Sequence, residues 1–249
     1  MSSRCMRVAR IRHIMRMELY YNFTNGKLRP WLPLPKLGEW LEHEGDVVSE
    51  SGLHASEHPF DALKHGTGTI LHLVELGGEL VPDGNPPERV FARRRKIVQT
   101  IDATELCLRF ALRCARDVTN RWNPPEVVKR YLETGDKSLS EAASDASKTV
   151  VWETEDPVIS GGAWAAKWAT LPAIHAKSAA LGAANSAAFA AEPGEEKQAI
   201  EKYRRWFKEM VEEEFSRAGL TDAIPGLLSG ESNGAGDSKS KPRCSENSN

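Results

Sequence analysis

VFARRRKIVQTI, residues Val90–Ile101, is followed after one aspartate by ATELCLRFALRCARDV, residues Ala103–Val118, and these two segments decide the predicted fold. The first is rich in valine, isoleucine and other strand-forming residues and is typical of a long strand. The second repeats small and apolar side chains every three or four residues, which indicates a helix with one buried face. The period changes at Asp102, which we interpret as the helix N-cap, with Glu105 completing a capping box.

Short strands are predicted before this change of period. Leu19–Phe23 is aromatic and is followed by Asn25 and Gly26, a pair typical of a turn. Ile70–Leu76 is the clearest strand, because its side chains alternate between two faces. We expect Gly77-Gly78 to form a two-residue hairpin turn, with the chain returning along 79–81, and a further short strand at 46–49.

The chain after Asp102 is predicted to be helical. A short helix between Asn123 and Gly135 is followed by others at 138–151 and 200–215, the last ended by Gly219. Between them lies an Ala-rich stretch, 163–191, which Pro172 and Gly182 are expected to interrupt. Strands followed by helices predict an α+β fold: a small, mostly antiparallel sheet domain and then a helical region with an Ala-rich helical hairpin.

The composition is that of an ordinary globular chain. Its 249 residues include 40% hydrophobic residues, 33 basic and 35 acidic side chains, and a net charge of -2. This balance excludes a fully disordered or collagen-like chain and argues against global attraction to nucleic acid or membranes. We divide the chain into a basic extension at 1–16, a β-rich domain at 17–102, a helical region at 103–220 and a disordered tail at 221–249.

The sequence also predicts a compartment. It has no run of 18 apolar residues, so we expect no membrane-spanning segment. Cys107 and Cys114 lie seven residues apart on one predicted helix, which separates their Cα atoms by roughly 10 Å. Because a disulfide requires less than about 7 Å, we expect free cysteines in the core of a cytoplasmic protein.

Four of the seven histidines fall within nineteen residues: His54, His58, His65 and His72. Histidine carries protons near neutral pH, so His54, His58 and His72 are candidate ligand-binding residues. No cysteine or His-Glu-x-x-His motif accompanies them, and no metal site is predicted. The alternative role for each is a hydrogen-bonded structural histidine. We expect Pro59 to begin a short helix, capped by Ser56 or His58.

The run SGLHAS at 51–56, followed by PFDA at 59–62 and a strand at 70–76, resembles an uncharacterised domain of phage and prophage proteins. Members have a Gly-(Phe/Leu)-His-(Ala/Phe)-Cys core, a following Pro-Leu-Asp, a closing strand rich in arginine and valine, and often Ala-rich helices. Here Ser49 and Ser56 stand at positions where cysteines are expected. The resemblance implies a phage or prophage accessory protein, located in the host cytoplasm if phage-encoded, and it implies no activity.

A second, more remote similarity is to part of the ADP-ribosyltransferase fold. There, a strand ending in Gly-apolar-His/Tyr-x-Ser, a short helix and an apolar strand hold nicotinamide dinucleotide (NAD). The resemblance implies that His54 and Ser56 line the cofactor and that Glu88 orients its ribose. His54, Ser56 and Glu88 are therefore candidate catalytic residues of an NAD-dependent transferase, although the Glu-x-Glu pair of that family is missing.

Basic residues cluster at 89–96 and continue on the next predicted helix, which suggests phosphate binding. Alternation along a strand places Arg93 and Arg95 on one face and Arg94 and Lys96 on the other. Arg93, Arg95, Arg109 and Arg113 are thus candidate nucleic-acid contacts. A charged edge strand, paired with nearby acids, is the alternative.

The leading hypothesis from the sequence is a soluble binding or interaction module with a protein partner. The partner is expected to dock near His54 or on the helical hairpin that the Ala-rich and final helices form. NAD-dependent transfer and nucleic-acid binding remain the two alternatives.

Overall fold

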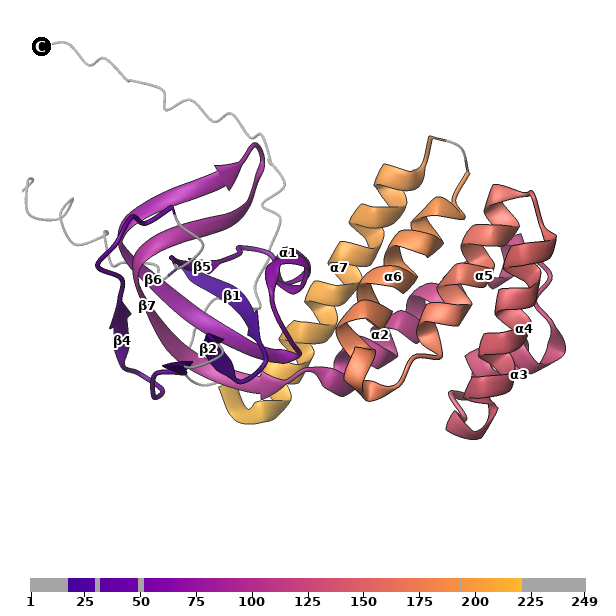
Figure 1. Ribbon diagram of the computed structural model, residues 1–249, viewed down its shortest axis with the longest axis horizontal. Coiled ribbons are helices and arrows are strands. Elements are labelled where there is room, and N and C mark those ends of the chain that lie inside the picture. The colour runs from indigo at the N-terminus through magenta and orange to yellow at the C-terminus, as the bar shows by residue number, and fades with distance from the viewer. Residues whose placement is uncertain (1–17, 30–31, 49–51, 193, 221–249) are drawn as a thin grey trace, which may run out of the picture.

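The computed structural model describes residues 18–29, 32–48, 52–192 and 194–220 (Figure 1). Strands come first along the chain and helices second, so the predicted α+β class is confirmed. The strands occupy one end of the molecule and the helices extend away from it (Figure 1). The extension predicted at 1–16 and the tail predicted at 221–249 lie outside the described residues.

The main sheet is antiparallel and is built around a long hairpin, β6 (Ile70–Gly84) and β7 (Pro87–Asp102). β1 (Leu19–Thr24) pairs with the first half of β6, so β6 is the central strand at that end. Four short strands complete the β structure: β4 (Trp40–Glu42) and β5 (Leu53–Ala55), which both pair with β7, and β2 (Lys27–Arg29) and β3 (Leu32–Pro33), which pair with each other.

The glycine pair predicted as a hairpin turn is instead inside β6. Gly77 pairs with Arg94, and the register shifts between Gly77 and Leu80, so the pair forms a β-bulge and the prediction is wrong. Gly78 has a φ of 75°, which a bulge accepts as readily as a turn does. The hairpin turns farther along, at Asn85 and Pro86, and Pro87 pairs with Gly84 as the first residue of β7, a position that proline tolerates.

The strand predicted at 46–49 is also wrong over the three residues that are described. Residues 47 and 48 form bends, and the Asp46 carboxylate accepts a hydrogen bond from the Val48 amide at 3.1 Å. Such a local bond competes with strand pairing. The strand of this region is β4, which carries Trp40.

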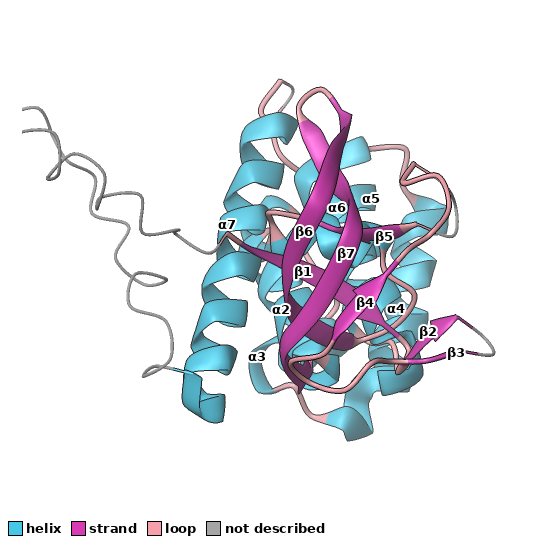
Figure 2. Ribbon diagram, turned by 90° about the vertical axis from the view of Figure 1, so that its left-hand side faces the viewer, coloured by secondary structure: helices cyan, strands magenta, loops and turns pink. Residues whose placement is uncertain are grey.

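The described residues contain seven α-helices, and three of them begin and end within three residues of their predicted bounds. α1 is a single short helix within the β part of the chain, and Figure 2 shows the others behind the sheet. Their bounds are α1 (Pro59–His65), α2 (Thr104–Asp117), α3 (Glu126–Thr134), α4 (Ser140–Glu153), α5 (Pro157–Ala169), α6 (Ala176–Phe189) and α7 (Glu196–Phe215). At the start of α2 the Asp102 carboxylate accepts from the Thr104 amide at 2.9 Å, although Ala103 occupies the N-cap position.

One hydrophobic core joins the sheet to the helices. Tyr21 and Phe23 of β1, with Leu71 and Leu73 of β6, face α1, α2 and α7, and Phe207 of α7 packs among them. A smaller apolar cluster on the other face of the sheet includes Tyr20, Ala55, Val74, Val90 and Ile97. Cys107 and Cys114 are free and buried in the main core, as predicted. None of the described helices is long and apolar enough to cross a membrane.

α5 and α6 form the predicted Ala-rich hairpin, but Gly182 does not interrupt it. Gly182 lies inside α6, beneath the indole of Trp168 on α5. A methyl group at Gly182 would come within 2.3 Å of that ring. The glycine is therefore a site of close helix contact, which the sequence pattern alone does not distinguish from a helix end.

We predict that Gly182→Ala destabilises the protein by about 1–3 kcal/mol, because overpacking at Trp168 outweighs the helix preference of alanine. Urea unfolding followed by circular dichroism measures this. Ser178→Ala, at an exposed position of the same helix, is the matched control and is expected to change stability by about 0.5 kcal/mol or less. Equal stability of Gly182→Ala and the wild type would contradict the close contact.

Candidate functional site

His54 lies on β5, half-buried beside the end of β7. Its ring packs edge-on against Phe91, with centroids 6.0 Å apart. Burial, followed by the charges of Arg95 and Arg89, lowers the pKa of His54 to about 4. The imidazole is therefore neutral at physiological pH and has cationic neighbours. It is poorly suited to carry protons near pH 7.

Ser56 is buried beside β5, and its backbone exchanges two hydrogen bonds with Tyr21. Its Oγ atom has no hydrogen-bond partner among the described residues. A nucleophilic serine requires a base within hydrogen-bond reach, and His54 does not provide one in this arrangement.

His58 and His72 have structural roles in this fold. The Nδ1 atom of His58 accepts a hydrogen bond from the Phe60 amide at 3.2 Å and so caps α1, as one of the two predicted caps. His72 is buried between two threonine hydroxyls, at 2.9 Å from Thr24 Oγ1 and 2.8 Å from Thr100 Oγ1. Burial lowers the pKa of both imidazoles to about 4, with smaller contributions from nearby arginines.

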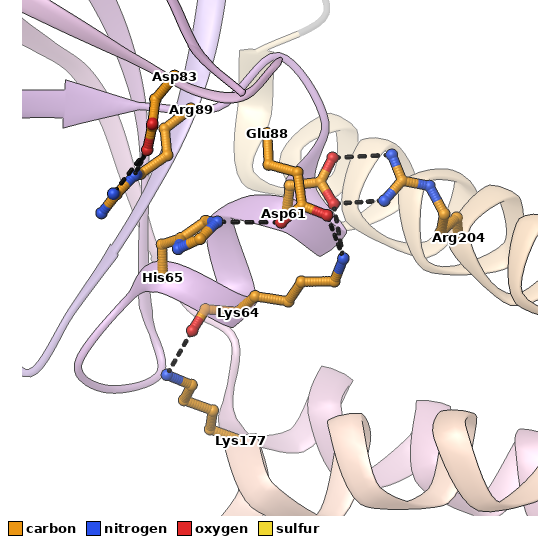
Figure 3. A network of polar contacts seen from close by, with 8 residues as sticks. All are labelled: Asp61, Lys64, His65, Asp83, Glu88, Arg89, Lys177 and Arg204. Atoms are coloured by element: carbon orange, nitrogen blue, oxygen red, sulfur yellow. Dashed lines mark hydrogen bonds and ion pairs between the residues drawn. The ribbon is translucent and has the colours of Figure 1, made fainter. Parts of the chain in front are cut away.

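Glu88 belongs to a polar network at the surface, shown in Figure 3. Its carboxylate accepts from Lys64 at 2.8 Å and lies 3.2 Å from the His65 ring, both on α1. The hydrogen bond from Lys64 is the main cause that lowers the pKa of Glu88. Glu88 is therefore held against α1, while the buried His72 lies within the sheet between Thr24 and Thr100. The structure does not gather the histidine candidates and Glu88 into one described cavity.

The strongest contact of this network joins α1 to α7. Arg204 binds the buried carboxylate of Asp61 through both terminal nitrogens, at 2.7 Å for the Nη2–Oδ2 pair (Figure 3). Burial alone would raise the pKa of Asp61, but the hydrogen bonds from Arg204 lower it below its usual value. Lys177 of α6 also donates to the Lys64 backbone carbonyl at 3.3 Å. Sequence reasoning missed this network, which fastens the sheet to the helices.

The four candidate nucleic-acid arginines are each engaged by the protein. Arg95 is only 3% exposed and donates to the His54 carbonyl at 2.8 Å. Burial lowers its pKa to about 10. Arg93 donates to two backbone carbonyls and to Glu79 at 3.1 Å.

On α2 the other two arginines contact α7. Arg109 pairs with Glu214 at 2.7 Å, and the Arg113 guanidinium lies 4.0 Å from the Trp206 ring centroid.

The helical region contains a hollow that sequence reasoning did not identify. Its volume is about 700 Å³, and its apolar lining includes Leu108 and Leu112 of α2, Tyr131 of α3, and Leu171, Pro172 and Ala173 between α5 and α6. Glu105, Arg109, Lys137, Ser140 and Thr170 supply polar groups. Leu108 and Leu112 lie four residues apart, outside the buried stripe of α2. This second apolar pair on the helix is the feature of the sequence that could have indicated the hollow.

A second, smaller hollow of about 350 Å³ lies between the end of α2 and the start of α7. Its walls include Asp117, which pairs with Lys202 and accepts a hydrogen bond from the Tyr203 hydroxyl at 2.8 Å. Three of its polar side chains, Asp117, Lys202 and Tyr203, therefore bind one another. Within the described part of the chain, no three histidine, cysteine or acidic side chains are grouped as metal ligands would be.

Comparison with known proteins gives no family to which these features can be assigned. No family model matches the chain, and neither a curated protein nor a solved structure matches it significantly.

Proposed function

We propose that the protein is a non-catalytic binding module and that its ligand occupies the 700 Å³ hollow between α2, α3 and the α5–α6 connection. The observation that carries this proposal is the hollow itself, because its volume and mainly apolar lining are those of small-molecule sites. The NAD-dependent alternative has less support, because the Glu88 carboxylate that would orient the ribose instead accepts from Lys64 at 2.8 Å and lies 3.2 Å from the His65 ring.

The ligand we propose is a small molecule with an apolar body and one acidic group. Leu108, Leu112 and Leu171 would contact the apolar body. Lys137 would reach the acidic group, since its side chain is 84% exposed and lies 3.9 Å from its nearest carboxylate, on Glu105. The sequence favoured a protein partner, but a hollow of this size with a mainly apolar lining fits a small molecule better. A cytoplasmic setting and a phage or prophage origin are proposed from the sequence motifs alone.

We predict that Ala173→Phe weakens ligand binding at least tenfold, because the larger side chain fills the hollow that Ala173 lines. Octanoate is the probe, and the binding constant is measured from amide chemical shifts of the ¹⁵N-labelled protein. Ile174→Phe is the matched control, since Ile174 is 86% exposed on the same turn. Saturable octanoate binding that Ala173→Phe leaves unchanged, or no octanoate binding at all, would contradict the proposal.

A further inference from the structure

Trp40 of β4 lies beside β7 and close to β6. It stands opposite Lys96 of β7, and its ring reaches across the hairpin to Gly77 of β6. A methyl group at Gly77 would lie 2.7 Å from Arg94 Nε and 3.2 Å from the indole, so glycine leaves room for both side chains beside the backbone. The indole thus contacts the sheet near Gly77, and the residue remains 36% exposed to solvent.

Two cations flank this indole. The Arg94 guanidinium lies 4.5 Å and the Lys96 ammonium 4.7 Å from the ring centroid. Lys96 is paired with Glu75. Arg94 is exposed and forms no ion pair with any residue that the structure describes, although Glu42 is its cross-strand neighbour. The Arg94 guanidinium therefore lies beside the Trp40 ring, and no described carboxylate pairs with its charge.

Two of the candidate nucleic-acid contacts predicted from the sequence, Arg93 and Arg95, lie on one face of β7, as alternation predicts, and Arg94 and Lys96 lie on the other. Arg93 binds Glu79 and backbone carbonyls, and Arg95 is buried and donates to the His54 carbonyl. The opposite face carries Arg94 and Lys96, and it is this face that meets the tryptophan.

We propose that Trp40 and Arg94 form a binding site for a nucleotide unit, in which the base stacks on the exposed part of the indole and the phosphate binds Arg94. A partly exposed aromatic ring is a stacking surface for any base. A free guanidinium beside it binds phosphate through charge-assisted hydrogen bonds. A neutral sugar would also stack on tryptophan, but it would leave the charge of Arg94 unused.

This site is separate from the hollow of the helical region, so its failure would not affect the proposed function. The shared chemistry, a base with a phosphate, occurs both in single strands and in free nucleotides. The test distinguishes them by measuring the anisotropy of a fluorescent twelve-nucleotide oligo-dT strand bound to the full chain, with and without excess dTMP. Displacement by dTMP assigns the site to free nucleotides as well as strands, whereas strand binding that resists dTMP assigns it to strands.

Trp40→Ala is expected to weaken strand binding about tenfold and Trp40→Phe to restore part of it, since phenylalanine keeps a stacking face. Arg94→Gln is expected to weaken binding several-fold and to lower the dependence of log K on log salt by about one. Trp152→Ala and Arg130→Gln change an exposed tryptophan and an exposed arginine elsewhere and are the controls. No strand binding, or binding unchanged in both Trp40→Ala and Arg94→Gln, would overturn the proposal.

Discussion

Replacing Arg204 with alanine is expected to lower the free energy of unfolding by about 3 kcal/mol. Asp61 is 4% exposed and accepts from both terminal nitrogens of Arg204, so the substitution would leave a buried carboxylate without its main partner. Removing one member of a buried ion pair typically costs about 3–5 kcal/mol. Lys64, 3.4 Å from Asp61, compensates in part, which places the expected loss at the lower end of this range.

Urea unfolding at pH 7 measures this loss. Arg205→Ala is the matched control, because Arg205 is the next residue of α7 and is exposed, and its substitution is expected to change stability by about 0.5 kcal/mol or less. The double variant Asp61→Leu/Arg204→Met replaces the pair with apolar side chains and is expected to recover most of the stability. A loss below about 1 kcal/mol in Arg204→Ala would mean that the pair behaves as a surface ion pair.

This ion pair also shows what sequence patterns leave out. The stripe through Leu106, Phe110 and Cys114 predicts α2, because a helical period is a local property and the buried face follows directly from it. Asp61 and Arg204 are separated by 143 positions. No periodicity relates them, and their contact depends on how α1 and α7 pack across the same core.

Glycine was the second limit of prediction. The sequence predicts a hairpin turn at Gly77-Gly78 and an interruption of the Ala-rich stretch at Gly182, since glycine tolerates backbone conformations that other residues avoid. In the structure both glycines allow close approach of another element: Gly182 lies against the Trp168 ring, and Gly77 lies against the side chains of Arg94 and Trp40. The sequence marks such positions but does not tell which neighbour comes near.

The candidate site was predictable only in part. The capping role of His58 follows from the Pro59 beside it, which begins α1. The hollow of the helical region depends instead on how α2, α3 and the α5–α6 connection fail to fill the space between them. That depends on packing angles and on side-chain volumes across four elements.

The free energy of unfolding is expected to fall steeply as the pH is lowered from 6.5 toward 4. In this range three histidines are neutral in the folded protein but take up protons when the chain unfolds. The folded-state pKa values of His54, His58 and His72 are about 4, below the ordinary value of 6.5. Between these values the unfolded chain binds more protons than the folded chain, so stability rises with pH in this window. The stabilising contribution is fully present above about pH 6.5 and is lost as the pH falls toward 4.

His72 is expected to contribute the most to this slope. It is 1% exposed, so it is expected to account for nearly one proton, or about 1.4 kcal/mol per pH unit. His54 and His58 are half-buried and contribute less, because solvent screens their charged forms. Glu212, whose pKa burial raises, opposes the trend in part of the same window.

Urea unfolding from pH 7.5 to 4.5 tests this prediction. His72→Gln is expected to reduce stability at pH 7, because it disturbs the bonds to Thr24 and Thr100, and to flatten the pH slope by about one proton. Gly182→Ala removes no titrating group, so it should shift the stability curve and keep the wild-type slope. The same slope in His72→Gln as in the wild type would show that His72 takes no proton on unfolding, and the linkage to its buried position would then be wrong.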